Sequence, residues 1–191
     1  MNPAFVIGIG GGSAAGKTVA AEELKKGLAP RHVTVINQDR YFLKAEQLPI
    51  HNDPTGARAW PDHNHPDSFD FPRLRQDVFD ARKSEADVVI VEGILVLYDT
   101  ELRALMDLKL FVAAEADERI VRRIRRNVAW GYNLEEVCDF YLDSVRYRHL
   151  EFCEPTRSHA DVVIPGGGNE RAAAEVVLAE VCERVKKALA S

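Results

Sequence analysis

One eight-residue segment, Gly11-Gly12-Ser13-Ala14-Ala15-Gly16-Lys17-Thr18, constrains the fold of this chain more than any other feature. It satisfies the pattern GxxxxGK[ST]. An apolar stretch, 4–9, precedes the segment, and a helical pattern from 16 to about 28 follows it. This strand, loop and helix order is the context that the pattern requires, so the sequence predicts a phosphate-binding loop of the P-loop type.

Each part of this segment has a separate expected role. Glycines let successive backbone N–H groups and the N-terminus of the following helix face phosphate oxygens. Lys17 is expected to act catalytically by reaching the terminal phosphates, and Thr18 to place its hydroxyl on a magnesium ion. The predicted ATP-binding residues are Gly11, Gly12, Ser13, Ala14, Ala15, Gly16, Lys17, Thr18 and Arg126.

Two other classes of nucleotide-binding protein compete with this interpretation. Gly8, Gly10 and Ser13 loosely mimic the dinucleotide-binding pattern GxGxxG. The Gly16-Lys17-Thr18 ending favours a phosphate cradle instead. A GTPase would carry an Asn-Lys-x-Asp motif, which the sequence lacks, so ATP is the predicted nucleotide.

Strands and helices alternate along the chain, which predicts an α/β fold of the P-loop NTPase type. We expect a mainly parallel five-stranded sheet, helices on both of its faces and a short lid. The predicted strands are 4–9, 33–37, 87–91, 108–112 and 161–164. The predicted helices are 16–28, 69–82, 117–126, a helix running to 151 and a last amphipathic helix capped by Asn169.

The length of 191 residues predicts a single P-loop kinase domain covering 1–191. Within it, the polar segment at about 40–68 has no clear period and is expected to be a substrate-binding insertion. Residues at about 127–134 contain a Gly and are expected to form the lid, which would exclude water during transfer.

Composition narrows the partners and the compartment. A formal net charge of −5 argues against a general nucleic-acid binder. The three cysteines form no CxxC pair, which favours a reducing cytoplasm, and no stretch approaches the ~20 apolar residues of a membrane span. The expected partners are ATP and a small-molecule acceptor, with no nucleic acid and no membrane, and a homo-oligomer stays open.

Two carboxylates follow predicted strands at the edge where parallel sheets bind ligands. Asp39 comes after the second strand and is a candidate catalytic base, although Asp also starts turns. Glu92 ends the third strand and is a candidate magnesium ligand together with Thr18, although it could equally cap the strand. Mg²⁺ is therefore the predicted cofactor, with ATP as co-substrate.

A helix near residues 117–126 carries five arginines in an otherwise acidic protein. They are Arg119, Arg122, Arg123, Arg125 and Arg126. Glu115 and Glu118 can pair with some of them, so we expect about two of the five to be structural. Arg123 and Arg126 are predicted to contact ligand phosphate.

His63 and His65, with Asp62 and Asp67, raise the question of a metal site. No further ligand follows at a fitting spacing. A polar substrate-binding loop is the predicted role of this segment.

The chain resembles the uridine kinase branch of the phosphoribulokinase and uridine kinase family over most of its length. The resemblance rests on the cradle, Gln38-Asp39, His65-Pro66-Asp67-Ser68-Phe69-Asp70, Glu92-Gly93-Ile94-Leu95, Lys109-Leu110-Phe111-Val112, the Arg-rich helix, Glu154-Pro155-Thr156 and Ala160-Asp161-Val162-Val163-Ile164-Pro165. It implies transfer of the ATP γ-phosphate to a ribose 5′-hydroxyl, with Asp39 as the base and an arginine lid.

The same resemblance implies the acceptor site. Asp39, Phe42, His65, Tyr98 and Arg123 fall where relatives bind the nucleoside, and Arg126 falls on the lid helix.

Four departures from the family pattern fall on the acceptor side. Asn64 stands where a ribose-holding Asp is usual, with Asp62 as the nearest carboxylate. Trp130-Gly131-Tyr132 replaces Arg-Gly-Arg, and Phe140 replaces a base-contacting Gln. Ala113 and Ala114 replace Asp-Thr after the fourth strand.

The sequence thus predicts a phosphotransferase with an alcohol acceptor, and uridine or cytidine leads as the acceptor. Nicotinamide riboside and pantothenate are alternatives within the same reaction class. A non-catalytic ATP-binding regulator is the alternative from a different class, because two lid arginines are replaced.

Overall fold

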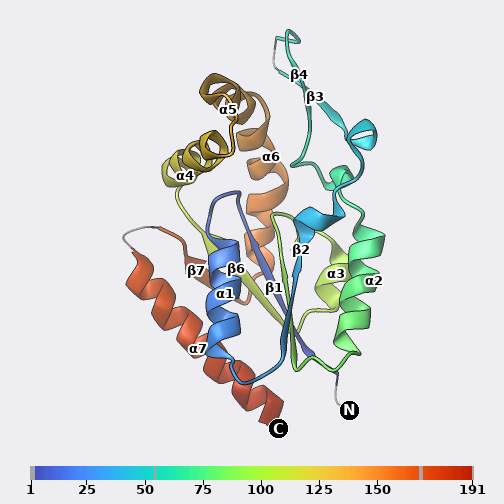
Figure 1. Ribbon diagram of the computed structural model, residues 1–191, viewed down its shortest axis with the longest axis vertical. Helices are drawn as coiled ribbons and strands as arrows, with labels where there is room; N and C mark the ends of the chain where they lie inside the picture. The colour runs from blue at the N-terminus through green and yellow to red at the C-terminus, as the bar shows by residue number, and fades with distance from the viewer. Residues whose placement is uncertain (1–2, 54, 168–169, 191) are drawn as a thin grey trace.

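The computed structural model describes residues 3–53, 55–167 and 170–190. Its centre is a five-stranded sheet whose strands are all parallel, in the order β2-β5-β1-β6-β7 (Figure 1). The strands are β1 (Phe5–Gly11), β2 (Val33–Asn37), β5 (Val88–Glu92), β6 (Leu108–Ala113) and β7 (Val162–Pro165). The predicted fold class is therefore confirmed.

The sheet is buried on both faces because its central strands are apolar along their whole length; every residue of β5 is buried. Helices α1 (Lys17–Gly27) and α7 (Arg171–Ala190) pack on one face. Helices α2 (Phe71–Arg82) and α3 (Thr100–Ala104) pack on the other (Figure 1). Two apolar clusters, one on each face, form the core.

The strand order places the carboxyl ends of β5, β1 and β6 side by side. β1 lies between β5 and β6, and the chain crosses from one side of β1 to the other. Ligands of open parallel sheets bind outside the carboxyl ends of the strands at such a point.

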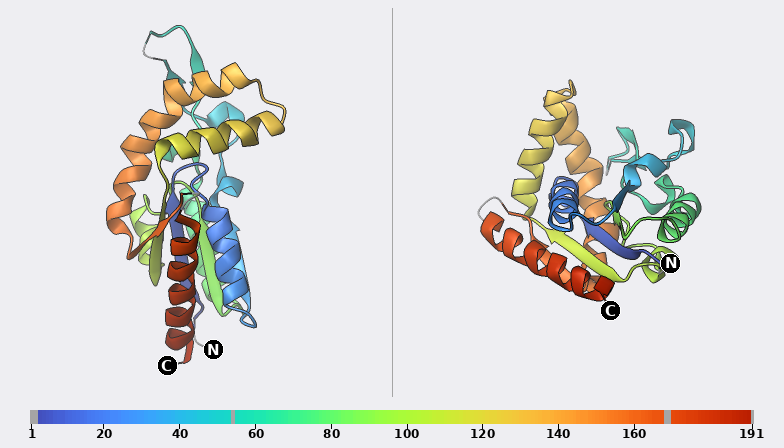
Figure 2. Two further views of the ribbon diagram at one scale, coloured as in Figure 1. Left: turned by 90° about the vertical axis from the view of Figure 1, so that its left-hand side faces the viewer. Right: turned by 60° about the horizontal axis from the view of Figure 1, so that its bottom comes forward.

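Two insertions stand beyond this edge of the sheet. The segment 40–68 contains an antiparallel hairpin, β3 (Ile50–Asn52) and β4 (Ala59–Pro61), between short 3₁₀ turns. Helices α4 (Ala116–Ala129) and α5 (Leu134–Phe140) form the second insertion. The segment predicted as the lid, about 127–134, covers the end of α4, the turn that joins the two helices and the first residue of α5. Figure 2 shows both insertions above the sheet.

The helix that begins with α5 continues to the base of the sheet with two π-helical stretches, Tyr141–Val145 and His149–Cys153, around α6 (Arg146–Arg148). A 3₁₀ helix, Glu154–His159, ends it before β7.

Two helices differ from the sequence-based prediction or lie partly outside the described residues. The short helix α3 was not predicted, since five residues carry too little periodicity; Asp99 caps it by accepting a hydrogen bond from the Leu102 N–H at 2.7 Å. The predicted cap of the last helix, Asn169, lies outside the described residues. Among the helices described, none is long and apolar enough to cross a membrane.

Candidate active site

The loop between β1 and α1 curls around an open concavity because two of its glycines adopt positive φ angles. Gly11 has φ 139°, and a Cβ there would lie 2.5 Å from the carbonyl oxygen of Val112. Gly16 has φ 108° and caps α1 without a side chain in the way. The loop therefore presents backbone N–H groups and a helix N-terminus to the same space, which suits phosphate.

Lys17 folds back over this loop. Its Nζ donates to the carbonyl oxygen of Gly12 at 3.0 Å, and only 9% of the residue is exposed. Burial lowers the pKa of Lys17, whereas the negative charges of Glu92 and Asp39 act in the opposite direction. A polyanion in the concavity would compensate the desolvated ammonium.

Glu92 meets the cradle because the parallel register sets it opposite Asn37 on one side and Ile9 on the other. Its Oε1 accepts hydrogen bonds from Asn37 Nδ2 at 2.6 Å and from Thr18 Oγ1 at 3.0 Å. Burial raises the pKa of Glu92, and Lys17 and Thr18 counteract this effect.

The pair of oxygen donors, Thr18 Oγ1 and Glu92 Oε1, fits a magnesium ion. Mg²⁺ prefers hard oxygen ligands and binds through one or two protein groups together with waters and substrate phosphates. The positive charge of a cation would also favour the ionised form of this buried carboxylate.

Asp39 lies in a 3₁₀ turn, Gln38–Tyr41, directly after β2. Its backbone N–H donates to Asn37 Oδ1 at 2.7 Å, and its own carboxylate is exposed to the cavity that Lys17 and Glu92 also line. The neighbouring Gln38 is fully buried and accepts a hydrogen bond from the Leu95 N–H at 2.9 Å, which fixes the turn.

Two arginines of α4 converge on the cradle. Arg123 Nη1 and Arg126 Nη2 donate to Ser13 Oγ at 3.0 and 3.3 Å. Burial and the neighbouring Arg126 lower the pKa of Arg123 to about 10. Two guanidinium groups this close to each other form a site that an anion would stabilise.

The other arginines of α4 have different surroundings. Arg119 donates from Nε to the carbonyl oxygen of Ala114 at 3.0 Å. Arg122 bonds the carbonyl oxygen of Gly166 at 2.7 Å and pairs with Glu118 at 2.6 Å. Arg119 and Arg122 thus each bond a backbone carbonyl oxygen, Arg122 also lines the cavity described next, and Arg125 is exposed.

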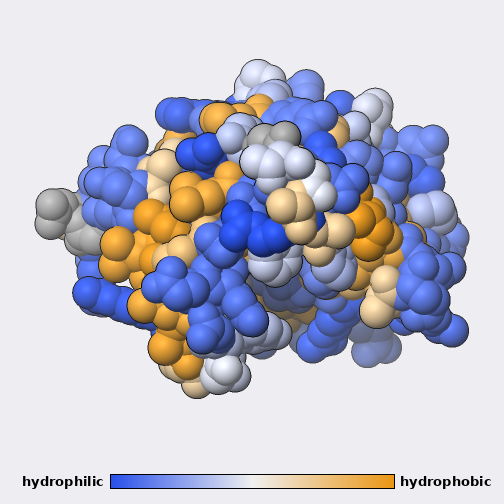
Figure 3. All heavy atoms as spheres, turned by 90° about the horizontal axis from the view of Figure 1, so that it is seen from above, coloured by the Kyte–Doolittle hydropathy of each residue, from blue (hydrophilic) through white to orange (hydrophobic). Residues whose placement is uncertain are grey.

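The cradle, Asp39, Glu92 and both converging arginines border one cavity of about 900 Å³. The same cavity is also lined by aromatic and amide groups from the two insertions, namely Phe42, Trp60, His63, Asn64, Trp130, Tyr132 and Phe140. Figure 3 views this end of the molecule, where hydrophilic and hydrophobic side chains adjoin. Charged and aromatic side chains therefore share one space, and the Arg126 guanidinium lies 4.9 Å from the centre of the Trp130 ring.

Asn64 is among the residues that line the cavity, whereas the nearby Asp62 is not. Asn64 is buried, and its Nδ2 has no hydrogen-bond partner among the residues that the structure describes. Asp62 is fully buried and pairs with Arg148 Nε at 2.6 Å, so it is not free to replace the missing carboxylate.

Two residues expected in the acceptor site lie elsewhere. His65 and Tyr98 do not line the cavity; their rings pack edge-on against Phe152, with centroids 4.8 and 5.8 Å away. Phe42 does line it and stacks on Phe69 at 4.4 Å.

Trp60 lines the cavity but was missed by the sequence reasoning. It lies in a segment without periodicity or motif, so no local signal pointed to it.

The chain is similar to known proteins over most of its length. The sequence model of the Phosphoribulokinase / Uridine kinase family matches residues 61–173. Uridine kinase of Chloroflexus aggregans is 35% identical, with 95% of each chain covered. Uridine kinase of Deinococcus deserti is 36% identical over 93% of this chain and 95% of its own.

Solved structures agree in fold. A structure from Bacillus stearothermophilus, described as a possible uridine kinase, aligns with a TM-score of 0.52 at 19% identity, covering 85% of this chain and 89% of that one. APE1195 aligns with a TM-score of 0.56 at 16% identity, covering 99% and 98%.

Proposed function

The chain belongs to the phosphoribulokinase and uridine kinase family, and from this membership we propose that it transfers the γ-phosphoryl group of ATP to the 5′-hydroxyl of a ribonucleoside, with uridine or cytidine as the leading acceptor. It is a phosphotransferase that acts on a hydroxyl group. The nucleoside and the roles of individual residues are parts of the proposal.

One observation carries the proposal: a phosphate cradle, an exposed carboxylate and several aromatic rings line the same cavity. The cradle suits the triphosphate, the rings suit a flat base, and Asp39 lies on the same surface as both.

In the proposed reaction, backbone N–H groups of the cradle and Lys17 hold the β- and γ-phosphates. Arg123 and Arg126 approach the same phosphates from α4 and stabilise the charge that develops on the transferred group. Asp39 accepts the proton of the acceptor hydroxyl as its oxygen attacks phosphorus and ADP leaves.

Thr18 and Glu92 would hold a magnesium ion in this arrangement. When bound, the ion neutralises negative charge on the phosphate oxygens. The hydrogen bonds from Asn37 and Thr18 already orient the Glu92 carboxylate toward the cradle.

The proposal is tested by measuring ADP formation from ATP and Mg²⁺ against a panel of acceptors, with a blank that lacks acceptor. The panel contains uridine, cytidine, purine ribonucleosides, nicotinamide riboside, pantothenate and sugar phosphates. We expect strong dependence on uridine or cytidine. Turnover with only another member of the panel would replace uridine and cytidine as the assigned acceptor. ATP binding without turnover on any acceptor would favour a non-catalytic regulator.

A further inference from the structure

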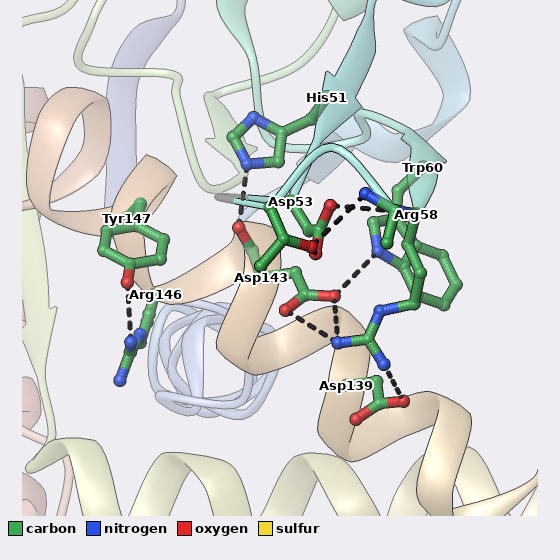
Figure 4. Close-up of polar contacts among 10 residues, drawn as sticks. His51, Asp53, Arg58, Trp60, Asp139, Asp143, Arg146 and Tyr147 are labelled. Atoms are coloured by element: carbon green, nitrogen blue, oxygen red, sulfur yellow. Dashed lines mark hydrogen bonds and ion pairs between the residues drawn. The ribbon is translucent and has the colours of Figure 1, made fainter.

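A polar cluster fastens the β3–β4 hairpin to the helix that follows the lid turn (Figure 4). Arg58 Nη2, from the hairpin, lies 2.9 Å from Asp143 Oδ2, and Arg58 Nη1 donates to Asp139. Trp60 Nε1 donates to the same Asp143 oxygen at 3.1 Å. His51 Nε2 lies 2.7 Å from the backbone oxygen of Asp143.

Asp143 is the centre of this cluster. It belongs to the π-helical stretch Tyr141–Val145, and its side chain is only 9% exposed. A buried carboxylate is stable only when it is paired and hydrogen-bonded, so Arg58 and Trp60 are held to it firmly. The two insertions above the sheet are joined by these contacts.

The consequence for the cavity lies in the orientation of Trp60. Trp60 lines the cavity, but its indole N–H donates to Asp143, which does not line the cavity. The Trp60 ring lies 5.4 Å from the ring of Phe140 at an interplanar angle of 48°. The Arg123 guanidinium in turn lies 5.7 Å from the centre of the Phe140 ring.

Trp60 and Phe140 therefore form a two-ring wall in the same cavity as Asp39. Such a wall offers apolar faces. The hydrogen-bonding group of the indole is already used by Asp143, and a phenyl ring has none. Contact with the face of a base is favourable for every base, because every base has a π-face.

We propose that Trp60, positioned by Asp143 and Arg58, is an acceptor-binding residue that contacts the flat face of the acceptor's base together with Phe140, without reading the hydrogen-bonding edge of that base. This inference rests on the proposed function and deepens it. Asp143 and Arg58 act through Trp60 and are positioning residues.

The first test compares uridine and cytidine, whose rings have the same size and different edges. Trp60→Ala is expected to lower kcat/KM for both nucleosides by about tenfold to a hundredfold, mainly through KM, and to leave their ratio and the KM for ATP unchanged. Trp60→Phe keeps a ring face and is expected to restore most of the loss. Phe79→Ala, a partly exposed ring on α2 outside the cavity, is the matched control.

Arg58→Ala tests the positioning role. We expect it to raise the KM for the nucleoside severalfold with little change in kcat, and to have no further effect in the Trp60→Ala background, because Arg58 acts through Trp60. If Arg58→Ala raised the KM for the nucleoside equally in the parent protein and in Trp60→Ala, Arg58 would not be a positioning residue for Trp60. A change of more than tenfold in the uridine-to-cytidine ratio of Trp60→Ala would show edge reading and overturn the proposal.

A binding measurement separates this inference from the proposed function. The chain has two tryptophans, so Trp130→Phe leaves Trp60 as the only one. We expect uridine to quench Trp60 fluorescence and ribose, which has no base, to leave it unchanged. Phosphorylation of uridine without quenching overturns the inference alone. Quenching without phosphorylation of any nucleoside overturns the proposed function alone, and neither signal overturns both.

Discussion

Asp39 and Glu92 both stand beside the cradle, but their surroundings suit them to different work. Glu92 is 3% exposed and accepts hydrogen bonds from Asn37 and Thr18. Asp39 is exposed on the cavity surface, where a hydroxyl can reach it. A general base needs this access to the proton that it removes, so Asp39 is the better candidate.

Asp39→Asn keeps the size of the side chain and removes its basicity. We expect kcat to fall by about 10²- to 10⁴-fold, because general-base catalysis contributes on this scale. The affinity for MgATP should change little, since the cradle is intact. Steady-state kinetics and calorimetric titration with MgATP measure the two quantities.

Asp67→Asn is the control for this substitution. Its side chain is 81% exposed in the same insertion, and it does not line the cavity. Transfer by Asp39→Asn at the parental rate would show that another group accepts the proton.

The charged residues of the cavity next to the cradle were predictable because their positions follow from strand ends and from a fixed motif. Lys17 and Thr18 lie one after the other at the start of α1, and Asp39 and Glu92 lie at the ends of adjacent parallel strands. Trp60, by contrast, reaches the cavity only through the fold of an aperiodic insertion and its contact with Asp143.

At the scale of elements, the helix behind the cradle departs most from its sequence pattern. A continuous helix through residue 151 was expected, whereas two π-helical stretches interrupt it. A π-helical turn holds about one residue more than an α-helical turn, so the side chains that follow it point to another face of the helix. A period of 3.6 residues gives no sign of such an insertion, so the inward positions of Asp143 and His149 could not be predicted.

His149 lies in the second of these stretches, against the phosphate cradle. A Cβ added to Gly12 would lie 3.0 Å from His149 Cε1. Burial, reinforced by the positive charges of Arg119 and Lys17, lowers the pKa of His149 to about 4. The imidazole is therefore neutral at pH 7, and its Nε2 lies 3.2 Å from the Glu154 carboxylate.

This lowered pKa makes the folded state less stable in acid. The unfolded chain binds a proton at His149 below pH ~6.5, whereas the folded protein binds it only near pH 4. The unfolded state holds more protons between these values, so the free energy of unfolding falls as the pH falls from 6.5 toward 4. The slope from this one group approaches about 1.4 kcal/mol per pH unit.

His149→Gln removes the titrating group. We expect the loss of stability between pH 7.5 and pH 5 to shrink by about 2 kcal/mol relative to the parent protein. Urea unfolding at the two pH values measures it. His159→Gln replaces an exposed histidine at the end of the same helical run in the same way and is the matched control. An unchanged dependence in His149→Gln would mean that other groups account for the acid sensitivity.

At the scale of the whole molecule, the alternation of strands and helices predicted the architecture correctly. Buried apolar runs mark parallel strands strongly, and each is separated from the next by a crossover. The order β2-β5-β1-β6-β7 and the fastening of one insertion to the other depend on contacts between distant segments, which periodicity does not encode. The part of the cavity lining that Trp60 and Phe140 form depends on those distant contacts.

A ligand that occupies the cavity should therefore stabilise the whole domain, because folding brings its walls together. A ligand that binds only the folded state adds RT ln(1 + [L]/Kd) to the free energy of unfolding, about 2.7 kcal/mol at one hundred times Kd. For a chain of this length we expect a non-hydrolysable ATP analogue with Mg²⁺ at that concentration to raise Tm by about 5–10 °C.

Lys17→Ala tests whether this stabilisation arises at the cradle. The Tm of Lys17→Ala without ligand can differ from that of the parent, so the quantity compared is the Tm shift on adding the analogue. We expect Lys17→Ala to lose this shift at the same ligand concentration. Lys25→Ala removes an exposed lysine from the same helix and should keep the full shift. If Lys17→Ala kept the full Tm shift as Lys25→Ala does, the stabilisation would not arise at the cradle, and the nucleotide would be bound elsewhere.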